Sequence, residues 1–402
     1  MSSPHVIVIG AGLGGLALAQ GLRQAGIEVT VYERDTSLTA RRQGYRLHLD
    51  AHARDALLRL LPPRLFELFL ATAGTPNPQF VLLDDQLNHI LTQDTPEEPA
   101  HFAVDRLVLR QILLAGLEDI VRFGTRFQRY EIGSQGRVTA YFADGSHAGG
   151  DVLVAADGVN SAVRGQYLPH ARIMDTGVRQ LYGMIPLSDR TRPLFDDRML
   201  GIFTAITGQD GTFVGVAPVQ FPERPQQAAA RIAPELRLPP VSDYMTCSFG
   251  ARREWFGDAD TRLRSMSGQE LHAIITDAVR TWHPRVRKII AACDPASVFA
   301  LPLRTSIPVA GWATTQVTLL GDAIHAMSPA AGAGACAALR DADRLTTALR
   351  TAAAGHDLLN ALRAYESEMI DYGFAAVRAG ASNGQRFLGQ DPLPDEQPAA
   401  SA

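Results

Sequence analysis

The stretch from Val6 to Glu33, VIVIGAGLGGLALAQGLRQAGIEVTVYE, decides the fold. Its pattern is typical of a strand, a glycine turn, a helix and a second strand, with Gly10, Gly12 and Gly15 in G-x-G-x-x-G spacing. Gly10 allows the sharp turn, Gly12 allows backbone to approach a pyrophosphate, and Gly15 allows the helix to pack closely on the sheet. The Glu33 carboxylate can accept hydrogen bonds from an adenosine ribose. The stretch predicts an adenine-dinucleotide site, although the motif alone does not choose between FAD and NAD.

The composition excludes several classes of protein. The 402 residues are 46% hydrophobic and 20% charged, as in a soluble enzyme with one large or two closely joined domains. A formal net charge of −4 offers no basic surface, so we expect neither nucleic-acid nor membrane partners. The chain runs at once into a core strand and has no apolar run near the roughly 20 residues that span a bilayer, so we expect a cytoplasmic protein. Three widely separated cysteines predict no disulfide framework and no metal site.

Arginines follow the first motif in two places. Arg41 and Arg42 lie in the polar loop behind Glu33, where a cation could neutralise a pyrophosphate or meet an incoming charged cofactor. The alternative is that both are solvated loop residues. Arg106 opens a predicted helix whose leucines form the buried face. Because the helix dipole disfavours a cation at an N-terminus, Arg106 needs an anionic or polar partner, which favours a cofactor contact.

Two further stretches each place an acid after a buried strand. In DVLVAADGVNSAVR, residues 151–164, Asp157 precedes a helix that Asp157 or Ser161 could simply cap. In QVTLLGDAIHAMSPAAGAGACAALRDADRLTTAL, residues 316–349, Asp322 can accept from the ribityl hydroxyls of a flavin. The helix that opens at Gly332 and Gly334 offers N–H groups to the negative edge of a reduced flavin. We expect the intervening histidine to be structural rather than a base.

The chain from 173 to about 256 is β-rich and predicts a mostly antiparallel sheet. Its apolar and aromatic positions are the candidate substrate residues: Tyr182, Met184, Phe203, Phe213, Met245 and Phe249. We expect about half of them to be plain core, because the alternation of apolar residues does not reveal which face of the sheet meets the flavin. This composition favours a polycyclic or polyketide-like substrate. A small benzoate would require a committed cation, for which the sheet offers only Arg179, Arg252 and Arg253.

With these stretches in hand, the chain resembles the single-component, class A FAD-dependent monooxygenases of the para-hydroxybenzoate hydroxylase fold. GAGLGG with Glu33, AADGVNSAVR and GDAIHAMSPAAGAG are similar to the three motifs of that family, in order. RLVLRQIL, which begins at Arg106, and YE-x-x-M-x-x-YG, at 365–373, most resemble the tetracycline-inactivating branch. One departure is Cys336, where the family usually has asparagine.

The resemblance implies an α/β fold in which a Rossmann-like FAD-binding domain is interleaved with a mostly antiparallel substrate domain, plus a C-terminal bridging helix. The expected ranges are 1–74, 100–173 and 300–355 for the FAD-binding domain, 75–99 and 174–299 for the substrate domain, 356–389 for the helix and 390–402 for a disordered tail. The expected FAD contacts, with Pro329 and Gly332 beside the flavin, are Gly10, Gly12, Gly15, Glu33, Arg34, Arg41, Arg42, Arg106, Asp157, Asp322, Gly334 and Ala335.

The resemblance also implies the reaction. NADPH or NADH would reduce FAD by transient docking, and a flavin C4a-hydroperoxide formed with O2 would hydroxylate or epoxidise a bulky aromatic substrate, in secondary metabolism or antibiotic inactivation. No catalytic acid or base is predicted, and the protein would be a monomer or weak homodimer. Two alternatives stay open: a reductase or cyclase of the same fold, and a non-catalytic flavoprotein that sequesters its ligand.

Overall fold

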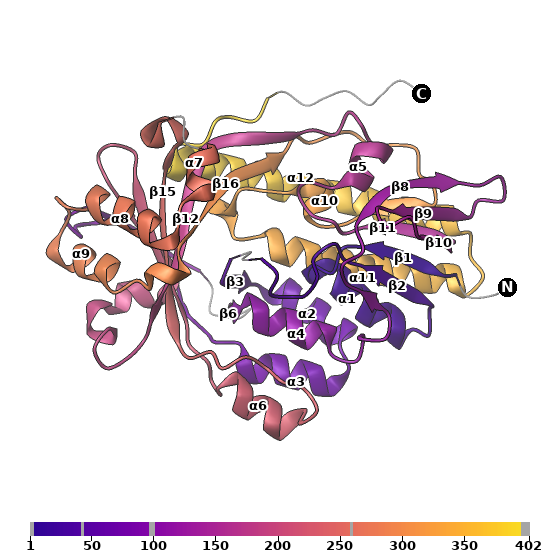
Figure 1. The fold of residues 1–402 in the computed structure, drawn as a ribbon, viewed down its shortest axis with the longest axis horizontal. Helices are drawn as coiled ribbons and strands as arrows, with labels where there is room; N and C mark the ends of the chain where they lie inside the picture. Colours follow the sequence, from indigo (N-terminus) through magenta and orange to yellow (C-terminus); the bar gives the residue numbers. More distant parts are fainter. Residues whose placement is uncertain (1–3, 42–43, 96–100, 258–259, 395–402) are drawn as a thin grey trace.

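The computed structural model describes residues 4–41, 44–95, 101–257 and 260–394. Figure 1 shows two halves, each built on its own sheet, with the long helix α12 (Leu358–Leu388) extending across both. The predicted fold class is confirmed: a Rossmann-like parallel sheet stands beside a mostly antiparallel sheet. The helical stretch after the first unit is two helices separated by Pro62, α2 (Ala51–Leu60) and α3 (Pro63–Thr72), as the paired prolines predict.

The first half contains a five-stranded parallel sheet. Its order is β17-β11-β1-β2-β7, with the bounds Val317–Leu319, Val152–Ala155, Val6–Ile9, Val29–Tyr32 and Val121–Arg122. The two central strands β1 and β11 are buried along their whole length, as expected for a parallel sheet covered on both faces. Helix α1 (Leu13–Gln24) packs against α11 (Gly334–Ala353) on one side of it. Strands β8 (Phe127–Ile132), β9 (Val138–Phe142) and β10 (His147–Gly150) form a meander that packs against β1 and β11.

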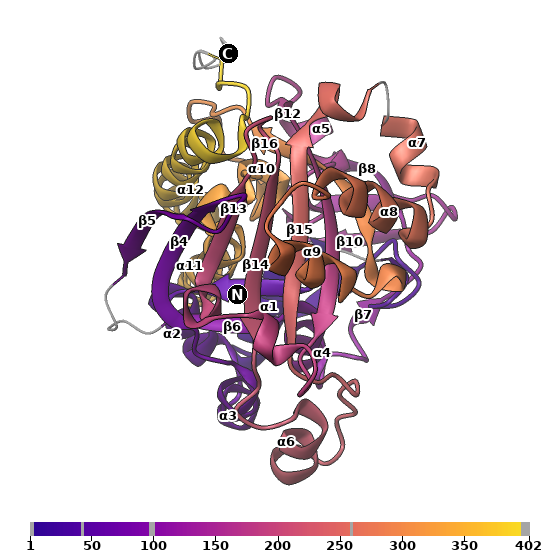
Figure 2. The ribbon, with the colours of Figure 1, turned by 90° about the vertical axis from the view of Figure 1, so that its left-hand side faces the viewer.

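The second half is a seven-stranded sheet. Its order is β16-β12-β15-β14-β13-β4-β5, with the bounds Phe299–Ser306, Ile173–Pro186, Tyr244–Arg252, Phe213–Val219, Gly201–Thr207, Asn77–Asp84 and His89–Asp94. All neighbours are antiparallel except β4 and β13. Figure 2 shows α8 (Gly268–Ala278) and α9 (Pro284–Ala291) lying over one face of this sheet. The opposite face is therefore the one available to meet the first half.

Smaller elements join the halves. Strands β3 (Arg46–Leu49) and β6 (Phe102–Asp105) form a two-stranded ribbon, and β6 leads directly into α4 (Arg106–Leu114). Helices α5 (Ala162–Tyr167) and α10 (Asp322–His325) follow β11 and β17. Helix α6 (Pro225–Ile232) packs on α3, and α7 (Asp260–Ser265) precedes α8. No helix in the described part of the chain is long and apolar enough to cross a membrane.

Two expected boundaries need correction. The boundary at residue 300 is wrong, because β16 pairs with β12 and so belongs to the seven-stranded sheet up to Ser306. The tail expected to be disordered from residue 390 begins instead with a buried side chain, Gln390, which is 4% exposed. Asp391 then forms an ion pair with Arg252 at 2.6 Å, so this segment is held on the sheet. Residues 395–402 lie outside the described residues.

Candidate functional site

The three glycines of the first motif are required for different reasons. Gly10 has a φ of +111°, and a Cβ placed on it would lie 2.3 Å from the carbonyl oxygen of Ala156. A Cβ on Gly15 would lie 2.1 Å from the carbonyl oxygen of Gly10. A Cβ on Gly12 would meet nothing closer than 4.0 Å. The protein itself therefore requires glycine at 10 and 15, whereas the open space at Gly12 leaves room for a ligand above the N-terminus of α1.

Glu33 closes the turn from behind. Its side chain is 6% exposed, and its two oxygens accept from the backbone N–H groups of Ala11, at 2.8 Å, and Asp35, at 2.9 Å. Arg110 lies opposite, because its guanidinium donates to the carbonyl oxygen of Ala11 at 2.8 Å and of Leu38 at 3.1 Å. Burial lowers the pKa of Arg110, and the charge of Glu33 opposes that shift. The turn is thus braced on both sides by buried charges.

Sequence reasoning missed the role of Arg110. It lies one helical turn after Arg106, beside the leucines of the buried face of α4, and is 3% exposed. An arginine on the apolar face of a helix was the available signal, since arginine is almost never fully buried without a partner.

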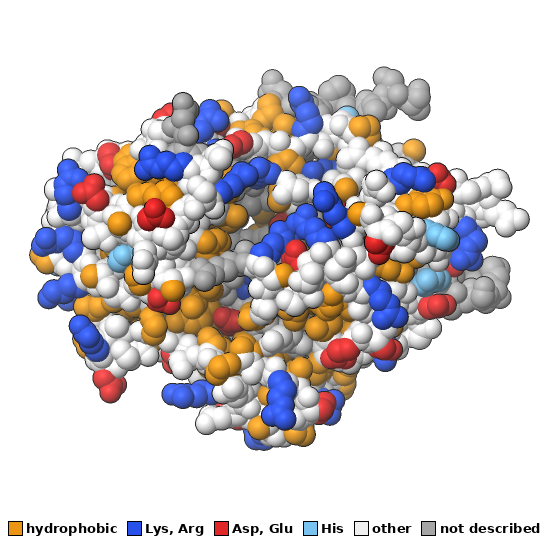
Figure 3. Space-filling model, viewed as in Figure 1, with side chains coloured by type: hydrophobic (Ala, Val, Ile, Leu, Met, Phe, Trp, Pro, Cys, Tyr) orange, Lys and Arg blue, Asp and Glu red, His pale blue; other side chains and the backbone are white. Residues whose placement is uncertain are grey.

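The loop arginines lie at the rim of this region. Arg41 is about half exposed and its Nε is 2.7 Å from Oδ2 of Asp35. Arg34 is also exposed, with its Nε 4.0 Å from Oδ1 of the same carboxylate. Arg42 lies outside the described residues. Figure 3 shows this face hollowed near its centre, with Lys and Arg side chains gathered on the side of the first half.

Asp322 and Arg106 lie close enough for their charges to affect each other's pKa. Asp322 is an exposed residue. Desolvation by the surrounding protein nevertheless raises the pKa of its carboxyl, and the positive charges of His325 and Arg106 oppose that shift. Arg106 has a buried Nε without a hydrogen-bond partner, and burial lowers its pKa. Among the described residues no ion pair joins the two. The chemistry of this pair, a carboxylate and a guanidinium with an unpartnered Nε, fits the hydroxyls and the pyrimidine edge of a flavin.

The start of α11 lies beside this space. Gly332 has a φ of +62°, in the left-handed region, and ends a 3-10 turn that begins at the exposed Pro329. A Cβ on Gly334 would lie 3.7 Å from Met327 and 3.9 Å from Oδ1 of Asp322, so the acid and the helix N-terminus are close together. Gly334 and Ala335 are half-buried. The thiol of Cys336, at the position where asparagine was expected, donates to the carbonyl of His48 at 3.5 Å.

The second motif is tied to the third. Oδ2 of Asp157 accepts from the N–H of Ala162 at 2.8 Å, as a helix cap would, but its buried Oδ1 has no partner in the described structure. The side chain of Arg164 donates to the carbonyl of Ala323, which follows Asp322, at 2.8 Å. Asp157 therefore combines a structural role with one acceptor left open.

His325 is a structural residue, as expected. Its Nε2 lies 2.7 Å from Oδ2 of Asp341, and the hydroxyl of Tyr372 donates to Oδ1 of the same carboxylate at 2.5 Å. A Cβ on Gly373 would lie 2.6 Å from the imidazole ring. The YG pair of the C-terminal motif is thus explained by packing: Tyr372 completes the network and Gly373 makes space for the histidine.

The candidate substrate residues divide between the two faces of the seven-stranded sheet. Met245 and Phe249 are fully buried in the core beneath α8 and α9, so their assignment to the pocket is wrong. Phe213 is 2% exposed and packs with Val178, Leu303 and the end of α12, which makes it core as well.

The remaining three lie on the face of the sheet opposite α8 and α9, which they share with Phe213. Tyr182, Met184 and Phe203 are half-buried. Tyr182 stacks on Phe299 with ring centroids 6.0 Å apart, and it lies within the electrostatic reach of Arg106. The charge of Arg106, on α4, therefore reaches this face of the sheet.

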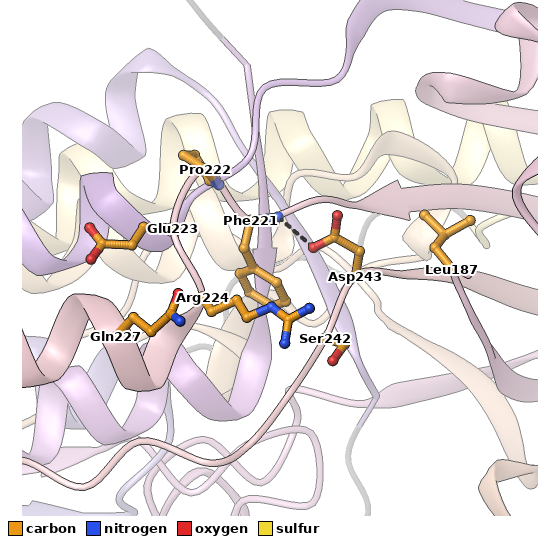
Figure 4. A pocket seen from close by; sticks show the side chains of 8 residues that line it. All are labelled: Leu187, Phe221, Pro222, Glu223, Arg224, Gln227, Ser242 and Asp243. Atoms are coloured by element: carbon orange, nitrogen blue, oxygen red, sulfur yellow. Dashed lines mark hydrogen bonds between the residues drawn. The ribbon is translucent and has the colours of Figure 1, made fainter. Parts of the chain in front are cut away.

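A separate pocket of about 330 Å³ lies at the ends of β12, β14 and β15. Figure 4 shows its lining, in which the N–H of Phe221 donates to Asp243 at 3.1 Å beside Arg224. None of the predicted cofactor or substrate residues lines it, so it is distinct from the candidate site.

Comparisons with known proteins agree with this geometry. Residues 98–379 match the FAD binding domain family, and residues 8–58 match the NAD(P)-binding Rossmann-like domain. An FAD-dependent urate hydroxylase of Klebsiella pneumoniae is 30% identical over 91% of this chain and 85% of its own length. A structure from Photorhabdus luminescens, assigned as an FAD-containing monooxygenase, has a TM-score of 0.84 at 29% identity over 96% of this chain and 99% of that one. The chain belongs to the FAD-binding-domain family of FAD-dependent monooxygenases, and FAD is its cofactor.

Other relatives set limits on this conclusion. The dual O-methyltransferase/FAD-dependent monooxygenase CTB3 of Cercospora beticola is 31% identical over 98% of this chain, but the match covers 47% of that protein. The chain thus spans about half the length of the first curated relatives it matches. The tetracycline destructase Tet(51) has a TM-score of 0.63 at 18% identity, over 96% of this chain and 91% of that one, which is a likeness of fold.

Proposed function

We propose that the protein is an FAD-dependent monooxygenase that uses NADPH or NADH and O2 to hydroxylate or epoxidise a bulky aromatic or polyketide-like molecule. The observation that carries this proposal is the position of Tyr182. It lies on the sheet face opposite α8 and α9 and within electrostatic reach of Arg106, which in turn is attracted by Asp322. A flavin held by Asp322 would therefore have a wall for an aromatic substrate directly beside it.

The residues that would hold FAD are the predicted ones, with Arg110 added as a positioning residue. Gly12 and the N-terminus of α1 would receive the pyrophosphate, Glu33 the ribose, and Asp322 the ribityl hydroxyls. The N-terminus of α11 would meet the pyrimidine edge. When bound, FAD would supply the redox chemistry, namely hydride acceptance from a nicotinamide and the activation of O2.

The remaining tasks would belong to the protein. The sheet face with Tyr182, Met184 and Phe203 would orient the substrate and keep water from the reacting atoms. Electron donors would dock transiently near Arg41 and Asp157, and near Arg42, which lies outside the described residues. We propose that 4–74, 101–173 and 307–355 form the cofactor-binding domain, with 75–95 and 174–306 on the substrate side.

The test is NADPH oxidation by the FAD-loaded protein over a panel of aromatic and polyketide substrates, with and without O2. Incorporation of one ¹⁸O atom from ¹⁸O2 into the product, with one NADPH consumed, is the expected result. Substrate turnover that continues without O2 would contradict the proposal and support the reductase or cyclase. Tight substrate binding without NADPH oxidation would instead support sequestration.

A further inference from the structure

The three arginines that the sheet sequence offers as candidate cations each contact a carboxylate of the protein. Arg179 is buried and its Nη2 lies 2.8 Å from Oδ2 of Asp175. Arg252 pairs with Asp391 at 2.6 Å, and Arg253 lies 3.0 Å from Glu254. None of them is committed to a ligand.

A different arginine reaches the sheet from the first half. Arg46, on β3, donates from Nε to the carbonyl oxygen of Pro218 on β14 at 2.9 Å. Neither of its other two nitrogens has a hydrogen-bond partner among the described residues, and Nη2 is buried. Burial lowers the pKa of Arg46 to about 10, and only the hydroxyls of Tyr244 and Tyr182 oppose that shift. An arginine in this position is desolvated without a compensating carboxylate, which costs free energy.

The nearest acid is already engaged. Asp105 is the cross-strand neighbour of Arg46. Its Oδ1 accepts from the N–H of Val108 at 2.9 Å and its Oδ2 accepts from the hydroxyl of Tyr244 at 2.9 Å. In the described structure no ion pair joins Asp105 to Arg46. The positive charge of Arg46 is therefore available to a bound molecule.

A second unpartnered group lies on the same sheet face. Gln180 is 4% exposed, and its buried Oε1 has no hydrogen-bond partner. Its amide is within hydrogen-bonding reach of the hydroxyl of Tyr182, and the charges of Arg46 and Arg106 both oppose the rise that burial causes in the pKa of that tyrosine. A buried acceptor and a guanidinium that both interact with one tyrosine are suited to a ligand that has both an anionic oxygen and a hydroxyl.

We infer that Arg46 binds an anionic oxygen of the substrate, a carboxylate, phenolate or enolate, and that Gln180 accepts a hydrogen bond from a neighbouring hydroxyl. The substrate is then an acidic, hydroxylated aromatic molecule rather than a neutral hydrocarbon. Charge-assisted hydrogen bonds to arginine are about twice as strong as neutral ones, so the anion fixes the orientation of the ring toward the flavin. This inference rests on the proposed function and specifies its substrate.

The experiment uses 3-hydroxy-2-naphthoate and, as the neutral probe, methyl 3-hydroxy-2-naphthoate, which keeps the hydroxyl and lacks the carboxylate charge. Dissociation constants are measured at pH 8 on the FAD-loaded protein by calorimetry and by the change in flavin absorbance. The wild-type protein should bind the anion at least about tenfold more tightly than the neutral probe, because each 1.4 kcal/mol of interaction corresponds to a factor of ten. Arg46→Gln should abolish this preference, Arg46→Lys should retain part of it, and the control Arg253→Gln, on an exposed ion pair, should retain all of it.

Equal affinities in the wild-type protein, or an unchanged preference in Arg46→Gln, would overturn the inference. If Arg46→Gln does not fold, Gln180→Glu serves instead: a carboxylate there should repel the anion and reverse the preference, and an unchanged preference would count against the inference. Failure of the proposed function is distinguishable, since it would leave anion binding intact while substrate-stimulated, O2-dependent NADPH oxidation is absent.

Discussion

Buried polar groups are paired differently in two regions of the protein: the support behind the glycine turn, and the walls of the space in front of it. Behind the turn, both oxygens of Glu33 and both of Asp341 accept hydrogen bonds from the protein. In the walls, Arg106, Arg46 and Gln180 each keep a buried polar atom without a partner, and behind the turn one nitrogen of Arg110 does so as well. Because buried polar groups in folded proteins are nearly always paired, the unpartnered atoms in the walls are candidates for a ligand, whereas the paired carboxylates already stabilise the protein. Glu33 can do both, since a carboxylate oxygen can accept a second hydrogen bond from a ribose.

The strongest test of this comparison adds one methyl group at Gly15 or at Gly12. Gly15→Ala should prevent stable folding, at a cost of about 3 kcal/mol or more, because its Cβ would lie 2.1 Å from a backbone oxygen. Gly12→Ala, whose Cβ has open space, should change the stability of the FAD-free protein by about 0.5 kcal/mol. It should nevertheless weaken FAD binding at least tenfold. Thermal unfolding and FAD titration of both variants measure this, and equal loss of stability would contradict it.

Next in size is the contrast between the two sheet faces. Met245→Ala should destabilise the protein by about 2–5 kcal/mol, since Met245 is fully buried beneath α8 and α9. Met184→Ala, on the half-buried face toward the flavin, should cost less and should raise the KM of an active substrate. Urea unfolding and steady-state kinetics separate the effects. A KM change in Met245→Ala alone would reverse the assignment of the faces.

These faces also show what the sequence could predict. The glycine turn, Glu33 and Asp322 follow from motifs whose backbone geometry is local, and Arg106 follows from its helix position. The sequence does not reveal which face of the sheet a residue occupies, because Met184 and Met245 show the same alternation until the register of β12 and β15 is known. Arg46 could not be identified because its contact with Pro218 joins residues 172 apart in the chain.

Removal of the Asp322 carboxylate tests the wall directly. Asp322→Ala should weaken FAD binding by about 1–3 kcal/mol, because ribityl hydroxyls would lose their acceptor in a largely enclosed space. Little change is expected in the stability of the FAD-free protein, since among the described residues Asp322 forms no ion pair. Equilibrium dialysis with FAD gives the first quantity and chemical unfolding the second. An unchanged FAD dissociation constant would contradict the assigned site.

A buried acid on α12 should respond to pH. Burial raises the pKa of Glu366, whose oxygens accept from the hydroxyls of Thr314 at 2.7 Å and Thr318 at 2.9 Å. Since the folded pKa lies above the unfolded value, its stabilising contribution is complete below the unfolded pKa and is lost as pH rises through the folded one. Glu366→Gln should therefore gain stability relative to wild type between pH 5 and pH 8, by about 1.4 kcal/mol per unit of the shift. A difference independent of pH would contradict this.

The smallest effect on stability is expected at the rim. Arg41 is about half exposed and pairs with Asp35, and exposed ion pairs contribute about 0–1 kcal/mol, so Arg41→Ala should leave unfolding nearly unchanged. If Arg41 also meets the dianionic pyrophosphate of a docking nicotinamide cofactor, the variant should slow flavin reduction at low salt. That loss should shrink as ionic strength rises and screens the charge. Stopped-flow reduction at two salt concentrations measures both effects, with Arg23→Ala, an exposed arginine paired with Asp119, as the control. Wild-type reduction rates at both concentrations would mean that Arg41 is a solvated loop residue, and the docking site would then have to be sought nearer Asp157.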